Sequence, residues 1–272
     1  SLVSTSLVAS DRLNTNSYQF FFKHLIYILM GISVVFLLSY LNTNNLFIIS
    51  NFLFIICFIS LLLVPFIGIE IKGSKRWIDL LFLPRFQPIE VLKPFIIIIM
   101  ASILSLEKKI NLYLKYLLSF IFLFPIIILL ISQPDLGQTI LIFSTWLALI
   151  FISGVNLILF FMFFILSSFF FLYIIFYIPK FEYILIRITS FLNSNSGNNY
   201  QSERASEAII NGGFFGKGIG EGVLKSKVPE AHTDYIVSVI SEEFGVIMIF
   251  LLILIFLYFI YKIFKKISLI KD

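Results

Sequence analysis

The sequence predicts an all-α membrane protein that crosses the bilayer about seven times and carries one large extracytoplasmic loop. Three observations predict this class. Hydrophobic residues make up 60% of the 272 residues, and charged residues 13%, against about 25% in a typical soluble domain. Apolar runs recur along the chain, many of them long enough for a hydrocarbon core that needs roughly 20 helical residues. These runs are continuous, whereas the strands of a membrane barrel alternate.

Seven apolar segments are expected to cross the membrane, within one membrane domain that covers residues 1–272. Most connections between them are short. Two are longer: residues 69–87 form a basic, aromatic-containing loop, and residues 179–235 hold most of the polar chemistry. The expected spans are residues 25–41, 46–68, 88–106, 112–131, 137–153, 155–178 and 236–261.

The long loop 179–235 is expected to contain structure of its own. Residues 181–192 mix apolar and charged positions, which suits a helix in the membrane interface. Residues 202–210 open with a serine and early acids, which favours a short helix. The glycine-dense residues 211–222 must turn repeatedly. Their context fits no nucleotide-binding motif, so we expect a flexible loop that lines a site.

Charge predicts the orientation of the spans. Short cytoplasmic loops concentrate lysine and arginine. The total number of basic residues is larger on the face of the long loops, but their density is higher on the other face, around Lys108, Lys109, Lys265 and Lys266. The density places the long loop outside the cytoplasm. The net charge of +5 suits basic loops and does not indicate nucleic-acid binding, and the single Cys57 excludes disulfides within the chain.

The third span opens with "QPIEVLKPF". Pro88 and Pro94 interrupt the helical hydrogen bonds, and Glu90 and Lys93, three residues apart, share one face. Ionisable groups at this depth usually face the bundle interior or a wet cavity. Two interpretations stay open: a structural ion pair, and a charged cavity wall.

The segment "KGSKRW" places Lys72, Lys75 and Arg76 beside Trp77. It fits an interfacial anchor and an anion-binding rim equally well. Further along, "QPDLGQ" places Asp135 at the start of a span, where capping of the helix is the favoured role.

The stretch "KSKVPEAHTDYIVSVISEEFG" concentrates acids and a histidine ahead of the last span. Its Pro229 discourages a helix, so we expect the helix to begin near Asp234 or Tyr235. Asp234 is then either an N-cap or a partly desolvated carboxylate suited to act as a general base. A metal site formed with Glu230 and His232 lacks the ligand number to stand alone.

Taken in order, "KGSKRWIDL…FQPIEVLKP", "SQPDLGQ" and "GGFFGKGIGEG…KVPEAHTDYIVSVISEEFG" resemble the SEDS family of bacterial peptidoglycan glycosyltransferases, the FtsW, RodA and SpoVE proteins. The resemblance covers nearly the whole chain. "PEAHTDY" and the opening "SLVAS" are more similar to the cell-division branch than to the elongation branch. The family pattern "QPSE" reads "QPIE" here, with Ile89 in place of a small polar residue.

The resemblance implies an enzyme that joins lipid II into glycan strands. The acceptor sugar hydroxyl loses a proton to the aspartate, and the pyrophosphate of the donor is held by cations, with Mg²⁺ or Mn²⁺ as a candidate cofactor. No residue is assigned as a metal ligand. The implied catalytic residue is Asp234, and the implied substrate-binding residues are Glu90, Lys93, Lys75, Arg76, Glu230, His232, Gln133 and Gln201.

The resemblance also implies partners and a location: lipid II, a class B penicillin-binding transpeptidase and other division proteins, in the bacterial inner membrane at the septum. Compared with the family's ten helices, the chain is expected to be a fragment that lacks the first and the last two. Two rival functions remain open. One is a lipid II flippase, which needs a path open to both faces. The other is a non-catalytic division scaffold.

Overall fold

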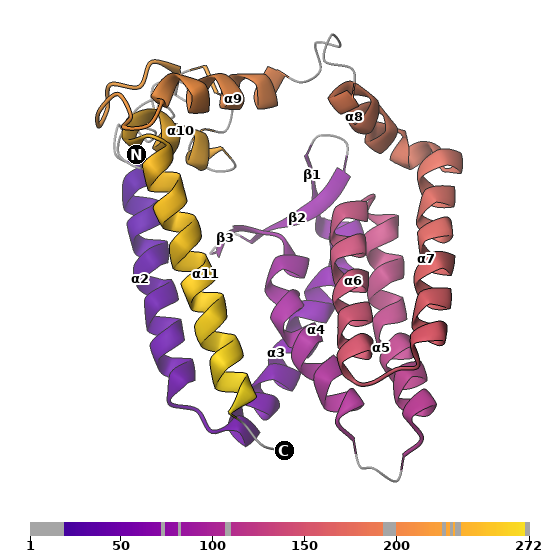
Figure 1. Cartoon of the computed structure of the whole chain (residues 1–272). Coiled ribbons are helices and arrows are strands. Elements are labelled where there is room, and N and C mark those ends of the chain that lie inside the picture. Colours follow the sequence, from indigo (N-terminus) through magenta and orange to yellow (C-terminus); the bar gives the residue numbers. More distant parts are fainter. Residues whose placement is uncertain are drawn as a thin grey trace. The chain divides into compact units, whose positions relative to one another are not determined.

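The computed structural model describes most of the chain and divides it into two compact units (Figure 1). The larger unit is Leu37–Ile188, and the smaller unit joins Ser1–Phe36 to Thr189–Asp272. The described residues are 19–71, 74–80, 83–106, 110–192, 200–224, 227–228, 231 and 235–269.

The larger unit is a helical bundle with a small sheet at one end (Figure 1). Its elements, in order, are α3 (Thr43–Ile67), β1 (Ile69–Ile71), β2 (Ser74–Leu80), β3 (Leu83–Phe86), α4 (Pro88–Leu104), α5 (Leu112–Ser132), α6 (Leu136–Ile152), α7 (Leu157–Tyr177), the 3-10 turn η1 (Pro179–Phe181) and α8 (Glu182–Leu192), which runs into the smaller unit.

The predicted basic loop 69–87 contains an antiparallel sheet, which the sequence analysis missed. β1 pairs with β2 through Ile69 and Trp77, and β2 pairs with β3 through Ile78 and Phe86. Side chains on a strand alternate between faces, and Ile78 is accordingly buried while Asp79 is exposed. The remainder of the described fold is helical, as predicted.

The core of the larger unit is built around α4, which packs against α3, α5 and α6. Leu92, Ile96 and Met100 follow one another at intervals of one helical turn, and all three are buried. Opposite them, α5 buries Leu123 and Leu130. These contacts fix the start of α4, which carries the charged motif.

The smaller unit comprises most of α2 (Gln19–Ser39), together with α9 (Tyr200–Gly212), α10 (Ile236–Phe244) and α11 (Val246–Ser268). α9 packs against α10 over a small apolar core. The core residues are Ala208, Val228, Ala231 and Val239. α8 and α9 confirm the helices expected near residues 181–192 and 202–210, and the interfacial placement of the former stays a prediction.

The predicted last span, residues 236–261, is not one continuous helix, so this prediction is wrong. The chain breaks at Gly245, whose φ of 80° belongs to the left-handed region that suits glycine. Before the break, α10 is short and buries Ser238, Glu242 and Glu243. The helix long enough to cross the membrane is α11, after the break.

Five helices among the described residues are long and apolar enough to cross a membrane: α2, α3, α5, α7 and α11. The other two expected crossings, α4 and α6, have 17 residues each. At 1.5 Å per residue each is about 26 Å long, slightly less than a typical hydrocarbon core of about 30 Å. A multi-pass membrane protein is therefore confirmed, and the number seven stays a prediction.

Candidate functional site

In the larger unit, a polar network forms where β2, the start of α4 and the turn between α5 and α6 meet. Arg76 on β2 is its centre. Its Nε donates to the carbonyl of Gln133 at 3.2 Å, and its Nη2 donates to the carbonyl of Pro134. Its Nη1 lies 3.6 Å from Oδ1 of Asp135. The guanidinium thus connects the sheet to the α5–α6 turn.

Asp135 occupies the N-cap position of α6, as predicted, and the backbone N–H of Gln138 in the first turn interacts with its carboxyl, although the side chain makes no cap hydrogen bond of ordinary geometry. Its Oδ2 also accepts a hydrogen bond of 2.7 Å from Nε2 of Gln87. The residue is 5% exposed. Burial raises the pKa of the Asp135 carboxyl above its ordinary value, although Arg76 and Gln87 act in the opposite direction.

Glu90 and Lys93 form the ion pair that their spacing predicts, with Nζ 2.5 Å from Oε2. Glu90 also accepts a hydrogen bond from Nε2 of Gln138 on α6. Lys93 lines a cavity of about 200 Å³ between α4 and α6, whose other lining residues include Ile96 and Leu141. The pair is therefore both a structural contact and part of a cavity wall.

The remaining candidates of this unit differ in accessibility. Lys75 is exposed and lies opposite Glu70 in the sheet register. Gln133 is buried, and its Nε2 donates to the carbonyl of Leu61 at 3.4 Å, which ties the turn to α3. Lys75 can reach a ligand from solvent, whereas the observed contact of Gln133 is structural.

The predicted catalytic segment belongs to the smaller unit. Asp234, Glu230 and His232 lie outside the described residues, as does the side chain of Gln201. Their described neighbours bracket the segment. α10 begins at Ile236, after Tyr235 at its N-cap, which confirms the expected start of the helix.

Two buried glutamates of α10 are functional candidates that the sequence analysis left without a role. Glu242 is 0% exposed and Glu243 is 1% exposed. Oε1 of Glu242 accepts hydrogen bonds from the backbone N–H of Leu224 at 2.9 Å and from Nδ2 of Asn211 at 3.2 Å. Oε1 of Glu243 accepts one from the N–H of Gly220 at 3.2 Å. The sequence did contain a signal for them, because two adjacent acids are unusual within a predicted membrane span.

The glycine-rich loop is docked against α10, which differs from the flexible loop expected. The N–H groups of Lys217 and Gly218 donate to the carbonyls of Glu242 and Glu243 at 3.0 Å. At Gly216, a Cβ atom would lie 2.3 Å from the carbonyl oxygen of Glu243. Only glycine permits such a close approach of two backbones.

Within the part of the chain that the structure describes, no group of three or more histidine, cysteine, aspartate or glutamate side chains could hold a metal ion.

Fold and site together define a polytopic helical membrane protein with a charged network where its helices meet a small extramembrane sheet. The chain belongs to the FtsW/RodA/SpoVE family of cell cycle proteins, whose family model matches residues 1–272.

Several curated relatives are similar over most of the chain. The probable peptidoglycan glycosyltransferase FtsW of Coxiella burnetii is 36% identical over 262 residues, covering 92% of this chain and 68% of that protein. The corresponding protein of Buchnera aphidicola from Acyrthosiphon pisum is 34% identical, covering 92% and 63%. That of Caulobacter vibrioides is 30% identical, covering 90% and 62%. The chain thus spans 62% to 68% of these relatives.

Two solved structures share the fold. A peptidoglycan synthase complex superimposes with a TM-score of 0.58 at 21% identity, covering 89% of this chain and 69% of the other. A point mutant of the rod shape determining protein RodA from Thermus thermophilus gives 0.54 at 21% identity, covering 92% and 68%. At this identity the likeness supports the arrangement of helices alone.

Proposed function

We propose that the protein is a peptidoglycan glycosyltransferase that polymerises lipid II during bacterial cell division, with Asp234 as the general base. The observation that carries the proposal is membership of a family in which several curated relatives, between 29% and 37% identical to this chain, are named probable peptidoglycan glycosyltransferases. In support, the segment "HTDY" stands directly before α10, which two buried glutamates connect to a docked loop.

In the proposed reaction, a hydroxyl of the acceptor sugar attacks the anomeric carbon of the donor chain. The new glycosidic bond forms as the bond to undecaprenyl pyrophosphate breaks, and Asp234 takes the proton of the hydroxyl. Glu230 and His232 position this carboxylate. A positioned base of this kind accelerates reactions by about 10² to 10⁴-fold. A single displacement inverts the α-linked donor to a β-linked product.

The leaving pyrophosphate requires positive charge more than a proton. Lys75 and Lys93 are the stronger candidates for this role, because Arg76 already binds two carbonyl groups and approaches Asp135. Mg²⁺ or Mn²⁺ is the candidate cofactor, and it would neutralise the pyrophosphate together with these lysines. Glu90, Gln133 and Gln201 complete the proposed substrate-binding set.

The proposal extends to partners and location. We assign lipid II as substrate, a class B penicillin-binding transpeptidase and other division proteins as partners, and the septal inner membrane as the site of action. Residues 1–272 form one membrane domain, and residues 179–235 lie outside the cytoplasm.

The test is polymerisation of labelled lipid II by the intact protein co-purified with its transpeptidase partner. The Asp234→Asn variant removes the base with little change in shape, and we expect glycan product to fall by about 100-fold or more. The control is Asp79→Asn, which removes an exposed acid paired with Arg85 and should retain activity. Equal amounts of polymer from both variants would show that Asp234 is not the general base and would favour a flippase or a scaffold. A lipid II translocation assay in vesicles would then distinguish the flippase from the scaffold.

A further inference from the structure

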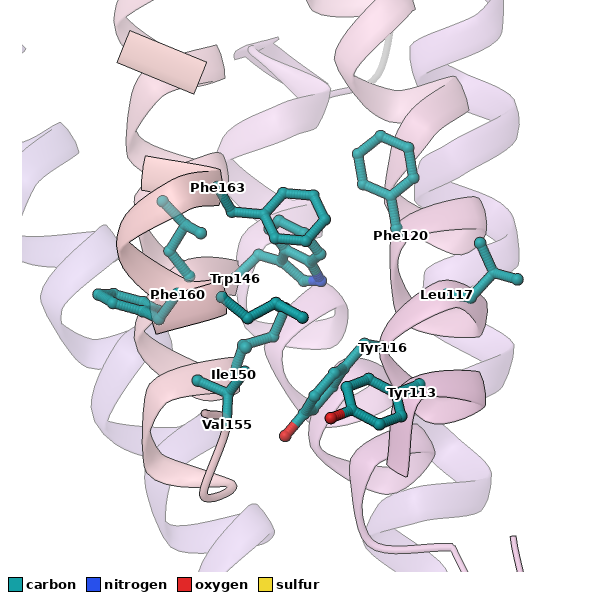
Figure 2. Close-up of a pocket in the computed structure, with 11 residues that line it drawn as sticks. Tyr113, Tyr116, Leu117, Phe120, Trp146, Ile150, Val155, Phe160 and Phe163 are labelled. Atoms are coloured by element: carbon teal, nitrogen blue, oxygen red, sulfur yellow. The ribbon is translucent and has the colours of Figure 1, made fainter. Parts of the chain in front are cut away.

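A second cavity lies in the larger unit, between α5, α6 and α7 (Figure 2). Its volume is about 390 Å³, within the range of about 300–1,000 Å³ that is usual for small-molecule sites. α4, which carries the charged pair, does not line it. The lining residues are Tyr113, Tyr116, Leu117, Phe120, Trp146, Leu147, Ile150, Val155, Leu159, Phe160 and Phe163.

The residues that line the cavity offer few hydrogen-bond partners to a water molecule. The lining is aliphatic and aromatic, and two of its polar groups are already engaged: Nε1 of Trp146 donates to Oγ of Ser119 at 3.0 Å, and the hydroxyl of Tyr116 lies 3.2 Å from that of Ser153. A buried water needs two to four polar partners. An empty space would forfeit the dispersion contacts of its walls. The lining therefore favours a hydrocarbon occupant.

The cavity opens to the side of helices that cross the membrane. Tyr113, Leu117 and Phe163 at its rim are 57%, 53% and 44% exposed, whereas Trp146 at its floor is 3% exposed. α5 and α7, which form the two sides, are both long enough to span the bilayer. A chain of a bilayer lipid can enter between them without passing through water.

One end of the cavity is suited to a headgroup. Tyr113 and Tyr116 stand in the first turns of α5, with their rings edge to face and their centroids 6.3 Å apart (Figure 2). Tyrosine is enriched where membrane helices reach the interface. These rings therefore mark this end of the cavity as the one that reaches the headgroup region.

We propose that this cavity binds one acyl chain of a bilayer phospholipid, with the phosphate headgroup at the level of Tyr113 and Tyr116. The residues that line the cavity include none of those assigned to the reaction, and the proposal does not depend on the proposed reaction. The bound lipid would hold α7 against α5 and α6, because the chain fills the space that the side chains leave.

The test uses the two tryptophans of the chain. In a Trp77→Phe background, Trp146 at the floor of the cavity is the only tryptophan. The intact protein is reconstituted into vesicles of phosphatidylglycerol and phosphatidylcholine whose acyl chains carry bromine, which quenches tryptophan on contact. We expect most of the Trp146 emission to be lost, relative to vesicles of the same lipids without bromine.

The decisive comparison fills the cavity. The double variant Leu117→Phe with Leu159→Phe adds volume inside it, and the matched variant Leu118→Phe with Leu166→Phe adds the same volume to exposed positions that do not line it. Quenching should fall at least twofold in the filled variant alone. Equal quenching in both variants, or none in either, overturns the proposal.

A second measurement needs no filled variant. Native mass spectrometry of the unaltered protein, released from mild detergent, should show one retained phospholipid. A spectrum without bound lipid overturns the proposal even if the filled variant does not fold.

Discussion

Lys75 and Arg76 are neighbours on β2 and have the same charge, but their surroundings in the structure differ. Arg76 binds two backbone carbonyls of a turn that lies 57 and 58 residues further along the chain, and it is partly buried. Lys75 is exposed. The sequence left an anchor and an anion-binding rim equally plausible, because the partners of Arg76 are distant in sequence. The structure favours a structural role for Arg76 and leaves Lys75 as the accessible cation.

Local spacing predicts local contacts well. Glu90 and Lys93 form the expected pair because residues three apart on a helix must be neighbours. Asp135 stands at the N-cap position as predicted, but its carboxylate also contacts Gln87 and Arg76 from other elements, which its local sequence does not predict. Residue-scale predictions were thus reliable where the partner is within one helical turn, and unreliable where it comes from another element.

The buried carboxyl of Asp135 should make stability depend on pH. Its pKa in the folded protein is raised above the ordinary value of 3.8, so the folded state holds the proton more tightly than the unfolded chain. This contribution is fully present below pH 3.8 and is lost as the pH rises through the raised pKa. The melting temperature of the unaltered protein, measured against Asp135→Asn in detergent, should therefore fall as the pH rises across this window.

The same experiment has an internal control. Asp79 is exposed and pairs with Arg85 on the sheet, so Asp79→Asn should not reproduce the dependence. If the melting temperature of the unaltered protein instead rose relative to that of Asp135→Asn as the pH increased, burial would not be the dominant effect on the Asp135 carboxyl.

At the scale of the element, a glycine determines where an apolar run is divided into two helices, which hydropathy does not show. The run after residue 236 is apolar enough to suggest one continuous span, and only the backbone conformation at Gly245 reveals two helices. The sheet between residues 69 and 86 was missed for a related reason. Its strands are short, and their pairing depends on contacts that periodicity in a single segment does not show.

The break between α10 and α11 should be intolerant of any side chain. At Gly245 a Cβ atom would lie 2.1 Å from the carbonyl oxygen of Phe214, at a φ of +80°. We expect Gly245→Ala to destabilise the protein by about 2–3 kcal/mol or more. Gly31→Ala in α2 is the matched control, because no atom lies within 4 Å of its Cβ. Thermal unfolding of both variants in detergent measures the difference, and equal melting temperatures would refute the close contact.

At the scale of the whole molecule, composition predicts the class of fold and leaves the number of crossings open. α4 and α6 are each short for a bilayer. The contact of Arg76 with the α5–α6 turn nevertheless requires α4 and α5 to run in opposite directions, since β2 and that turn lie at the same end. We infer that α4 and α5 cross the membrane as a pair.

This pairing predicts opposite accessibility at the two ends of α4. In a Cys57→Ser background, which removes the single native cysteine, an impermeant maleimide should label Lys75→Cys in intact spheroplasts. It should label Asn111→Cys, at the start of α5, only after permeabilisation. Labelling of both positions from the same side would show that α4 does not cross.

The docked glycine loop has a consequence for how its sequence can vary. Its backbone makes most of the hydrogen bonds to α10: the N–H of Gly220 donates to the Glu243 side chain, and the N–H groups of Lys217 and Gly218 donate to the carbonyls of Glu242 and Glu243. Exposed side chains of the loop such as Phe215 and Ile219 can therefore be exchanged without losing these hydrogen bonds, whereas Gly216 has no room for a side chain and a single inserted or deleted residue would shift the donors out of register. Homologous loops should therefore vary in sequence at the exposed positions while keeping the same number of residues.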